Sequence, residues 1–344
     1  MSKREIDRDR AIECPSAIPG LSFRPFAGDA DYEPMLAVIE ASKREDHDEW
    51  SPCLDDIART YRHLVHCDPR RDMLMAQIDG QMIGYGRVWW EDEHDGDRVY
   101  NFFINLVPSW RGKGVRLALL HWLERRARAL SDENPSSRAE TLQTGGTEYE
   151  RDSQRVLEAE GYRIVRWEYH MVRSLDEAIP PASLPPGIEL RPATDAQAEA
   201  IYVAASEAFV DHWGVTDWFS AESLAEWRES PTYDPSLWAI AWDGDQIVGM
   251  VLNYADAREN AEYGRKRGYT ETICVRRPWR GRGIARALIT HSLQMWKARG
   301  MTEASHGVDT QNPSGALPLY ESLGYRPRKT YFTYRKPLHT DRVP

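Results

Sequence analysis

One stretch of the sequence combines glycines and arginines in a spacing suited to holding a phosphate. Residues 273 to 300, ICVRRPWRGRGIARALITHSLQMWKARG, begin as a β-branched run, continue as a basic loop and end in a helical pattern. Gly281 and Gly283 place no Cβ in the way of an anion. The backbone N–H groups of such a loop converge at the positive end of the following helix, so we expect a pyrophosphate to bind here. The spacing matches neither GxxxxGK[ST] nor GxGxxG.

Two other residues have side chains suited to proton transfer. Tyr320 lies in NPSGALPLYESLGY, residues 312 to 325, where Ser314 is predicted to cap a short helix that Gly324 ends. Glu271 lies on the predicted strand ahead of the basic loop. An isolated tyrosine or glutamate at such a place is commonly a half-buried ring or an ordinary strand residue. Their shared proximity to a phosphate loop favours a function.

The loop RGRGIA, residues 280 to 285, matches RxxGx(G/A) and resembles the acetyl-CoA signature of the GNAT superfamily of N-acetyltransferases. The segment from Asn312 to Tyr325 resembles the second motif of that family. In the usual pattern Ala and Tyr follow the Asn by three and seven residues, whereas Ala316 and Tyr320 follow by four and eight. The resemblance implies acetyl-CoA (coenzyme A) as cofactor. The predicted cofactor-binding residues are Ile273, Cys274, Val275, Arg280, Gly281, Arg282, Gly283, Ile284, Ala285 and Asn312.

The implied reaction is attack of an amine on the thioester of acetyl-CoA. The backbone N–H of Val275, at the predicted strand end, is a candidate donor to the developing oxyanion. The resemblance gives Tyr320 the role of the acid that protonates the departing thiolate, and a phenol pKa of about 10 is close to that of a thiol, ~8.5. Glu271, directly or through a water, is the candidate base for the proton that the amine sheds.

The chain contains an internal repeat with a period of roughly 165 residues. Four pairs of segments recur in the same order: LSFRPF with IELRPA, MLMAQIDGQMIGYG with WAIAWDGDQIVGM, INLVPSWRGKGVRLALL with ICVRRPWRGRGIARALI, and LEAEGY with YESLGY. WEYHMVRSL and TYFTYRKPL are predicted to close the two halves within their own hairpins. The Pro-rich residues 179–187 are interpreted as a linker between domains at 1–178 and 188–344.

This organisation predicts an α/β (α+β) fold of two tandem GNAT-like domains, each a mixed, mostly antiparallel β-sheet flanked by helices. The resemblance to GNAT proteins covers nearly the whole chain. Among tandem members, the arrangement is similar to that of the mycothiol synthases.

The two halves differ at the positions that carry chemistry. In the first loop, RGKGVR, Arg116 replaces Ala285 and either crowds the cofactor or extends along its phosphates. Leu157 replaces Tyr320, and Phe102 replaces Glu271. We therefore predict a catalytic C-terminal half and a degenerate N-terminal half. A second, vestigial cofactor site is predicted at Leu106, Arg111, Gly112, Lys113 and Gly114.

An aromatic and acidic segment, FVDHWGVTDWFSAESLAEWR (209–228), is a candidate wall of the acceptor site. The predicted substrate residues are Asp211, Trp213, Asp217 and Trp218, which favour a cationic small molecule. Core packing is the alternative, because a chain with 13 Trp must bury many of them.

Composition restricts the classes of partner. With 54 carboxylates against 44 Lys and Arg, the chain is not expected to bind nucleic acid generally. No apolar run approaches the ~20 residues of a membrane span, and the polar opening MSKREIDRDR does not fit a secretory signal, so we expect no membrane association and a cytoplasmic location. Four scattered cysteines, Cys14 among them, fit reduced thiols. His63, His66 and Cys67 lie at helical spacing near Cys53, but without paired ligand spacing we predict no metal.

The leading hypothesis is an acetyl-CoA-dependent N-acetyltransferase that acts on a primary amine of a small molecule. The alternatives are a CoA-binding sensor or scaffold without turnover, and a protein or peptide N-acetyltransferase. We expect a monomer with an internal pseudo-dimer, or a homodimer.

Overall fold

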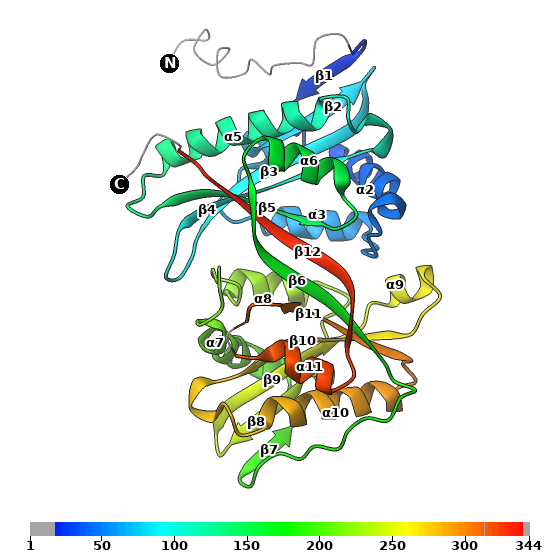
Figure 1. The fold of residues 1–344 in the computed structure, drawn as a ribbon, viewed down its shortest axis with the longest axis vertical. Helices are drawn as coiled ribbons and strands as arrows, with labels where there is room; N and C mark the ends of the chain where they lie inside the picture. Colours follow the sequence, from blue (N-terminus) through cyan, green and yellow to red (C-terminus); the bar gives the residue numbers. More distant parts are fainter. Residues whose placement is uncertain (1–17, 313, 340–344) are drawn as a thin grey trace. The chain divides into compact units, whose positions relative to one another are not determined.

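The computed structural model describes residues 18–312 and 314–339. The chain divides into two compact units. Unit 1 runs as far as Val165 and takes up the chain again from Thr333, and unit 2 is Arg166–Phe332. This division differs from the predicted boundaries at 178 and 188, because two long strands each contain residues of both units (Figure 1). Among the described residues, no helix is long and apolar enough to cross a membrane.

Unit 1 begins with a short strand and two helices, as the amphipathic segment after LSFRPF predicts. Its elements are β1 (Leu21–Arg24), α2 (Tyr32–Asp46), α3 (Leu54–Arg62), α4 (Pro69–Asp72), β2 (Met73–Ile78), β3 (Gln81–Asp92), β4 (Arg98–Leu106), α5 (Val115–Glu133), β5 (Glu140–Thr147) and α6 (Arg151–Ala159). The strand order is β1-β2-β3-β4-β5, and only β4 and β5 are parallel among these neighbours. The Asp79–Gly80 turn between β2 and β3 has positive φ at both residues, which a two-residue hairpin requires.

Unit 2 repeats this order. Its elements are β7 (Ile188–Arg191), α7 (Ala198–Phe209), α8 (Ala221–Arg228), β8 (Ala239–Asp243), β9 (Gln246–Tyr254), α9 (Ala257–Glu262), β10 (Arg267–Val275), α10 (Ile284–Ala298), β11 (Glu303–Asp309) and α11 (Ala316–Ser322). The strand order is β7-β8-β9-β10-β11, with β10 and β11 the parallel pair. The predicted helix from Ile284 is confirmed, and Gly300 follows its end with a φ of 79°.

The closing strands are β6 (Arg163–Ser174) and β12 (Arg326–Pro337), and they do not form the predicted hairpins. β6 follows unit 1 in the chain but pairs antiparallel with β11 of unit 2, from Glu303 opposite Ser174 to Asp309 opposite Glu168. β12 follows unit 2 in the chain, but its last residues belong to unit 1, where it neighbours β5. The strand beside β11 therefore comes from β6, and the strand beside β5 comes from β12.

Each sheet is covered by helices on both faces. In unit 1, α5 packs on the face that carries Leu74, Ile83 and Leu106, and α2 and α3 pack on the face that carries Met75 and Tyr85. In unit 2, α10 packs on the face that carries Val248 and Val251, and α7 and α8 cover the face that carries Met250 and Leu252 (Figure 1). In unit 1, the two-residue alternation of side chains along β2 places Leu74 and Met75 in opposite cores.

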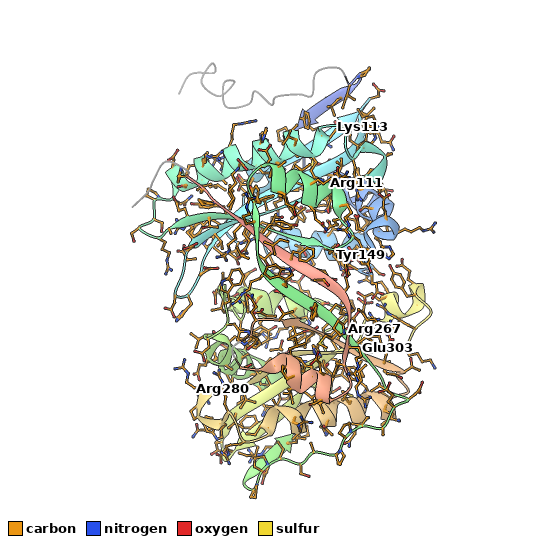
Figure 2. All side chains as sticks on the ribbon, viewed as in Figure 1. Arg111, Lys113, Tyr149, Arg267, Arg280 and Glu303 are labelled. Atoms are coloured by element: carbon orange, nitrogen blue, oxygen red, sulfur yellow. The ribbon has the colours of Figure 1, made fainter. Side chains whose placement is uncertain are left out.

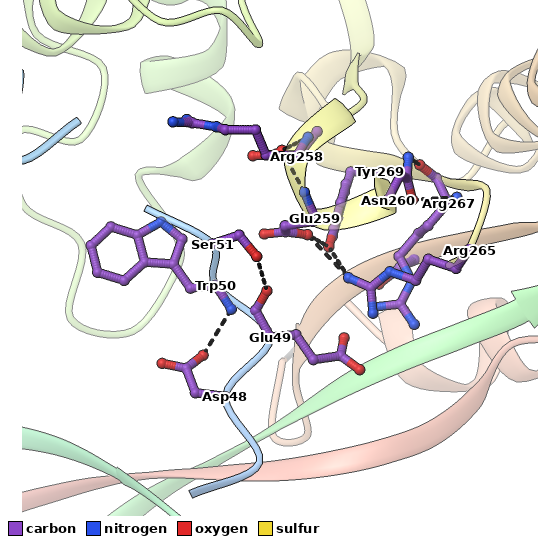
Figure 3. A network of polar contacts seen from close by, with 12 residues as sticks. Asp48, Glu49, Trp50, Ser51, Arg258, Glu259, Asn260, Arg265, Arg267 and Tyr269 are labelled. Atoms are coloured by element: carbon purple, nitrogen blue, oxygen red, sulfur yellow. Dashed lines mark hydrogen bonds and ion pairs between the residues drawn. The ribbon is translucent and has the colours of Figure 1, made fainter. Parts of the chain in front are cut away.

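Polar contacts fix the connection from α9 into β10 (Figure 3). The Glu259 carboxylate accepts hydrogen bonds from the Tyr269 hydroxyl, at 2.5 Å, and from the Arg265 guanidinium, at 3.1 Å. Asn260 exchanges two hydrogen bonds with the backbone of Arg267. These contacts hold the start of β10 in register, and its other end carries the candidate site.

Candidate active site

A gap opens between the parallel strands of unit 2 beyond their first residues. The register of β10 with β11 runs from Arg267 opposite Glu303 to Tyr269 opposite Ser305, although β10 continues to Val275 and β11 to Asp309. Within that unpaired part, β10 bulges against β9, and Thr272 takes a φ of 50°. A bulge adds one residue on one strand and turns the following side chains to the other face. The bulge therefore separates the orientation of Glu271 from that of Val275.

The backbone of Val275 faces this gap. Arg276 donates its N–H to the carbonyl oxygen of Val248 on β9, at 2.9 Å. Successive residues of a strand point their backbone groups to opposite edges, so the N–H and C=O of Val275 point away from β9. The Arg280 guanidinium donates a hydrogen bond from Nε to that carbonyl oxygen, at 3.0 Å. The N–H remains directed to the gap, as an oxyanion donor requires.

The loop after β10 has the geometry that the glycine spacing predicts. Gly281 and Gly283 have φ of 73° and 82°, and Gly283 is the N-cap of α10. A Cβ on either glycine would meet nothing within 4 Å, and no described residue accepts the N–H of Gly281. The N–H groups in the first turn of a helix have no intrahelical acceptor. Together with the dipole of a 15-residue helix, they form an anion site.

The side chain of Arg280, labelled in Figure 2, holds the loop through its hydrogen bonds. Its guanidinium donates to the carbonyl oxygens of Val275 and Ala208 and to Asp211, at 3.0, 2.8 and 2.6 Å. Asp211 also pairs with Arg277, and these two arginines lower the pKa of its carboxyl group. Asp211 was predicted to bind the substrate. It follows the end of α7 and is already ion-paired with two arginines.

Tyr320 projects from α11 into the core of unit 2. Its side chain is 6% exposed, and its ring centroid lies 4.0 Å from that of His306. Burial, reinforced by the nearby Glu271 carboxyl group, raises the pKa of Tyr320 well above that of an exposed phenol. The hydroxyl group is therefore protonated at neutral pH and available as a donor.

Glu271 lies beside β11, on the face of the sheet that α7 covers. It is opposite Leu252, and one of its carboxylate oxygens accepts the N–H of Gly307 at 3.1 Å. Burial raises its pKa to about 8, and the Gly307 N–H opposes that shift. A carboxyl group with a pKa near neutrality is suited to accept a proton from an amine. A Cβ on Gly307 would meet nothing within 4 Å, so no described side chain covers this part of β11.

His306 is a buried titratable group that no motif predicted. Its ring is fully buried between Tyr320 and Tyr325, and neither ring nitrogen has a hydrogen-bond partner among the described residues. Burial lowers its pKa to about 3, so the imidazole is neutral. Only its inward position on β11 distinguishes it, and that position depends on the strand register.

Comparison with known proteins bears directly on this arrangement. The model of the acetyltransferase (GNAT) family matches residues 35–136 and 198–325, which together are more than half of the chain. The chain belongs to the GNAT acetyltransferase family. Both repeats are therefore GNAT segments, and the enzyme class is that of an acetyltransferase.

Several relatives match over nearly the whole chain. A mycothiol acetyltransferase of Streptomyces scabiei is 25% identical over 325 residues, which cover 93% of this chain and 96% of that protein. The crystal structure of a GCN5-related N-acetyltransferase from Sphaerobacter thermophilus superposes with a TM-score of 0.71 at 26% identity, over 94% of this chain and 98% of that one. A tandem GNAT protein from the clavulanic acid biosynthesis pathway has the same fold, with a TM-score of 0.65 at 14% identity, over 93% and 99% of the two chains.

The remaining predicted cofactor-binding residues of this GNAT protein lie partly in the core and partly on the exposed loop. Ile273 packs against the α10 core, and burial raises the pKa of the Cys274 thiol to about 12. Arg282 is exposed on the loop, and Ala285 is half-buried in the first turn of α10. The side-chain oxygen of Asn312 accepts the N–H and hydroxyl of Ser314, so Ser314 does not cap α11, whose N-cap is Gly315. Pro313 lies outside the described residues.

The aromatic segment divides between core and surface. Phe219 and Trp227 pack into the core under α7, as the packing alternative predicts. Trp218 is 43% exposed and Asp217 is exposed, whereas Trp213 lies under the Arg166 guanidinium, 4.8 Å from its ring centre. Asp217 and Trp218 are thus exposed members of the predicted substrate set, and Trp213 is half-buried.

His63, His66 and Cys67, weighed above as zinc ligands, do not lie on one helix. α3 ends at Arg62, and His66, with a φ of 50°, stacks on Trp90. In the described parts of the chain, no group of three or more His, Cys, Asp or Glu residues is placed to hold a metal. Cys14 lies outside the described residues.

The repeat alignment misassigned the counterpart of Glu271 in unit 1. β4 pairs with β3 without a register shift from Arg98 to Leu106, so Phe102 lies on the face of α5 and packs on Tyr162, at a centroid distance of 5.7 Å. Because β10 bulges and β4 does not, Phe103 is the residue that faces the α2 side, against Tyr85. Neither phenylalanine can transfer a proton. The prediction that unit 1 lacks a base is therefore the same whether Phe102 or Phe103 is the counterpart of Glu271.

Proposed function

We propose that this chain transfers an acetyl group from acetyl-CoA to a primary amine of a small molecule, and that unit 2 carries the reaction. The observation behind the proposal is that Tyr320, Glu271 and the Val275 N–H belong to elements bordering one gap, between β10 and β11, next to the glycine loop. The family uses an acyl-CoA donor. The open loop of unit 2 offers its pyrophosphate an anion site.

The proposed steps assign one task to each group. The neutral amine attacks the thioester carbonyl, and the Val275 N–H stabilises the oxyanion. As the tetrahedral intermediate collapses, the C–S bond breaks and the thiolate takes the proton of the Tyr320 hydroxyl. Glu271, directly or through a water, takes the proton that the amine nitrogen loses. Holding the amine against the thioester supplies much of the remaining rate.

Two features of unit 2 support a compact amine as the acceptor. The carboxylates of Glu271 and Glu168 interact, and each pKa is raised chiefly by burial. Trp213 and Trp218 supply aromatic surface in the accessible part of the segment before α8. The relatives named mycothiol acetyltransferase make a cysteinyl-sugar amine a natural member of any acceptor panel.

The direct test measures CoA release from acetyl-CoA with polyamines, aminoglycosides, amino sugars and cysteinyl-sugar amines, and identifies the acetylated product by mass. We expect one class of small amine to give saturable turnover that Tyr320→Phe removes. Binding of acetyl-CoA without turnover on any amine would favour a sensor or scaffold instead. Turnover on peptides alone would favour a protein acetyltransferase.

A further inference from the structure

The loop of unit 1 that matches the cofactor loop of unit 2 is closed by an ion pair. Arg116 is the sixth residue of RGKGVR, where unit 2 has Ala285. Asp152 lies on α6, five residues before Leu157, and Gly315 lies five residues before Tyr320. Two small residues in unit 2 thus correspond to two oppositely charged residues in unit 1.

The Asp152 carboxylate occupies the anion site of the unit 1 loop. One of its oxygens accepts the N–H of Gly112 at 2.9 Å, and the other accepts Nε of Arg116 at 2.7 Å. Gly112 is the counterpart of Gly281 by its place in the loop. In unit 2, no described residue accepts the N–H of Gly281. A carboxylate on such an N–H satisfies the same donor that a phosphate would use.

The Arg116 guanidinium also fills the gap beside β4. It donates to the carbonyl oxygen of Ile104 at 3.2 Å, and Ile104 corresponds to Ile273 on β10. The Arg116 and Asp152 side chains are 8% and 11% exposed. The pair therefore takes both the anion site and a backbone acceptor on the inner edge of the strand.

We propose that the Arg116–Asp152 pair takes the place of CoA in unit 1, so that the chain binds one CoA, in unit 2, and that these two residues decide this. A pyrophosphate entering unit 1 would have to displace the Asp152 carboxylate from Gly112 and would be repelled by it. It would also require Arg116 to leave Ile104. The inference rests on the proposed function, because it takes the unit 2 loop as a CoA site.

The test titrates the full-length chain with CoA by calorimetry. The wild type should bind one equivalent, and Gly283→Val should bind none. In the Gly283→Val background, Arg116→Ala with Asp152→Gly should restore one equivalent, which a further Gly114→Val should remove. Both charges are removed together because a lone buried partner would be destabilising by itself.

A mirror variant, Ala285→Arg with Gly315→Asp, places the pair in unit 2 and should abolish CoA binding there. This arm decides the proposal if the unit 1 variants do not fold, as judged by near-UV circular dichroism. Gly315 has a φ of 70°, which Asp tolerates better than most residues.

Three results would overturn the inference. The first is a wild-type chain that binds two equivalents of CoA. Equivalent to this is a Gly283→Val chain that still binds one CoA and loses it when Gly114→Val is added. The second is a folded unit 1 variant that gains no site, and the third is a mirror variant that binds CoA like the wild type. A wild-type chain that binds no CoA would overturn the proposed function as well, which separates the two failures.

Discussion

The two units keep the same support for the glycine loop but differ in what the loop faces. Arg111 repeats the contacts of Arg280: its guanidinium binds Asp46 on α2 and the carbonyl oxygen of Leu106 at the end of β4. Lys113 lies over Trp110, at 4.5 Å from the ring centre. The loop can therefore persist as a structural turn without a ligand. The groups that differ are few: the bulge in β10, Tyr320, Glu271, and the small residues that Arg116 and Asp152 replace.

This difference teaches that a retained motif is weaker evidence for binding than the space in front of it. Gly112 and Gly114 have φ of 69° and 84°, like Gly281 and Gly283 in unit 2. The conformation of the loop is the same in both units. We expect the side chains that reach the unit 1 loop, Arg116 from α5 and Asp152 from α6, to decide whether an external anion can enter.

The largest expected effect comes from Gly283→Val, with Gly114→Val as its matched control. Both substitutions place a β-branched side chain at positive φ, which costs about 1–2 kcal/mol of stability in each unit. In unit 2 the new side chain also fills the anion site, so acetyl-CoA affinity should fall more than about 100-fold, or about 2.7 kcal/mol. Calorimetry and thermal unfolding measure both quantities. Unchanged affinity in Gly283→Val would contradict the loop as the cofactor site.

Tyr320→Phe should lower turnover by about 10²- to 10⁴-fold and leave acetyl-CoA affinity unchanged, because only the departing thiolate needs the hydroxyl. Tyr162→Phe is the control, since Tyr162 has the place of Tyr325 in unit 1 and donates to Glu124 at 3.0 Å. It should reduce the melting temperature without reducing turnover. The comparison requires conditions in which chemistry limits the rate. Wild-type turnover in Tyr320→Phe would exclude Tyr320 as the acid.

Glu271 should give the reaction a pH dependence. With a pKa of about 8, it is mostly protonated at neutral pH, so kcat/KM should rise as the pH rises through about 8. Glu271→Gln should flatten that rise and reduce kcat/KM above it by about 10²- to 10⁴-fold. Glu91→Gln in unit 1, whose amide oxygen can still accept the hydrogen bond from Asn101, should change neither. A rise that persists in Glu271→Gln would assign the base elsewhere.

The same raised pKa has a consequence for stability. Because the folded state holds the proton of Glu271 more tightly than the unfolded chain does, its contribution to stability is fully present below the unfolded pKa, about 4.3. It is lost as the pH rises towards about 8. The unfolding free energy of the wild type relative to Glu271→Gln should therefore fall across that range in denaturant titrations. A flat difference would show that burial of the carboxyl group is incomplete.

The aspartates that support the loops should affect stability rather than turnover. The Arg111 and Asp46 side chains are 12% and 13% exposed, whereas those of Arg280 and Asp211 are 33% and 30% exposed. Asp46→Asn should destabilise by about 3 kcal/mol, because it removes the nearest charge partner of a buried guanidinium. Asp211→Asn should cost about 0–1 kcal/mol, as exposed pairs do. Thermal unfolding ranks the two variants, and the reverse order would contradict the distinction by burial.

Much of the fold could be predicted because it depends on local patterns. The glycine loop, the helix from Ile284 to Ala298 and the tandem repeat all follow from spacing along the chain. The placement of β6 beside β11 and of β12 beside β5 could not be predicted, because the sequence of a strand does not determine which neighbouring strand it pairs with. The bulge at Thr272 was missed for a related reason: it exists only relative to the register of β9.

By itself, the sequence determined the family resemblance, the order of the elements, the glycines at positive φ and the difference between Tyr320 and Leu157. These depend on residue identity and on the short-range geometry of the backbone. The tertiary structure decided which side chains meet. It brought Asp152 to Gly112 and Arg116, committed Asp211 to arginines instead of leaving it free for a substrate, and turned Glu271 to the face opposite that of Phe102. The physical reason is that contact across a sheet depends on register and on helix placement, which no single segment encodes.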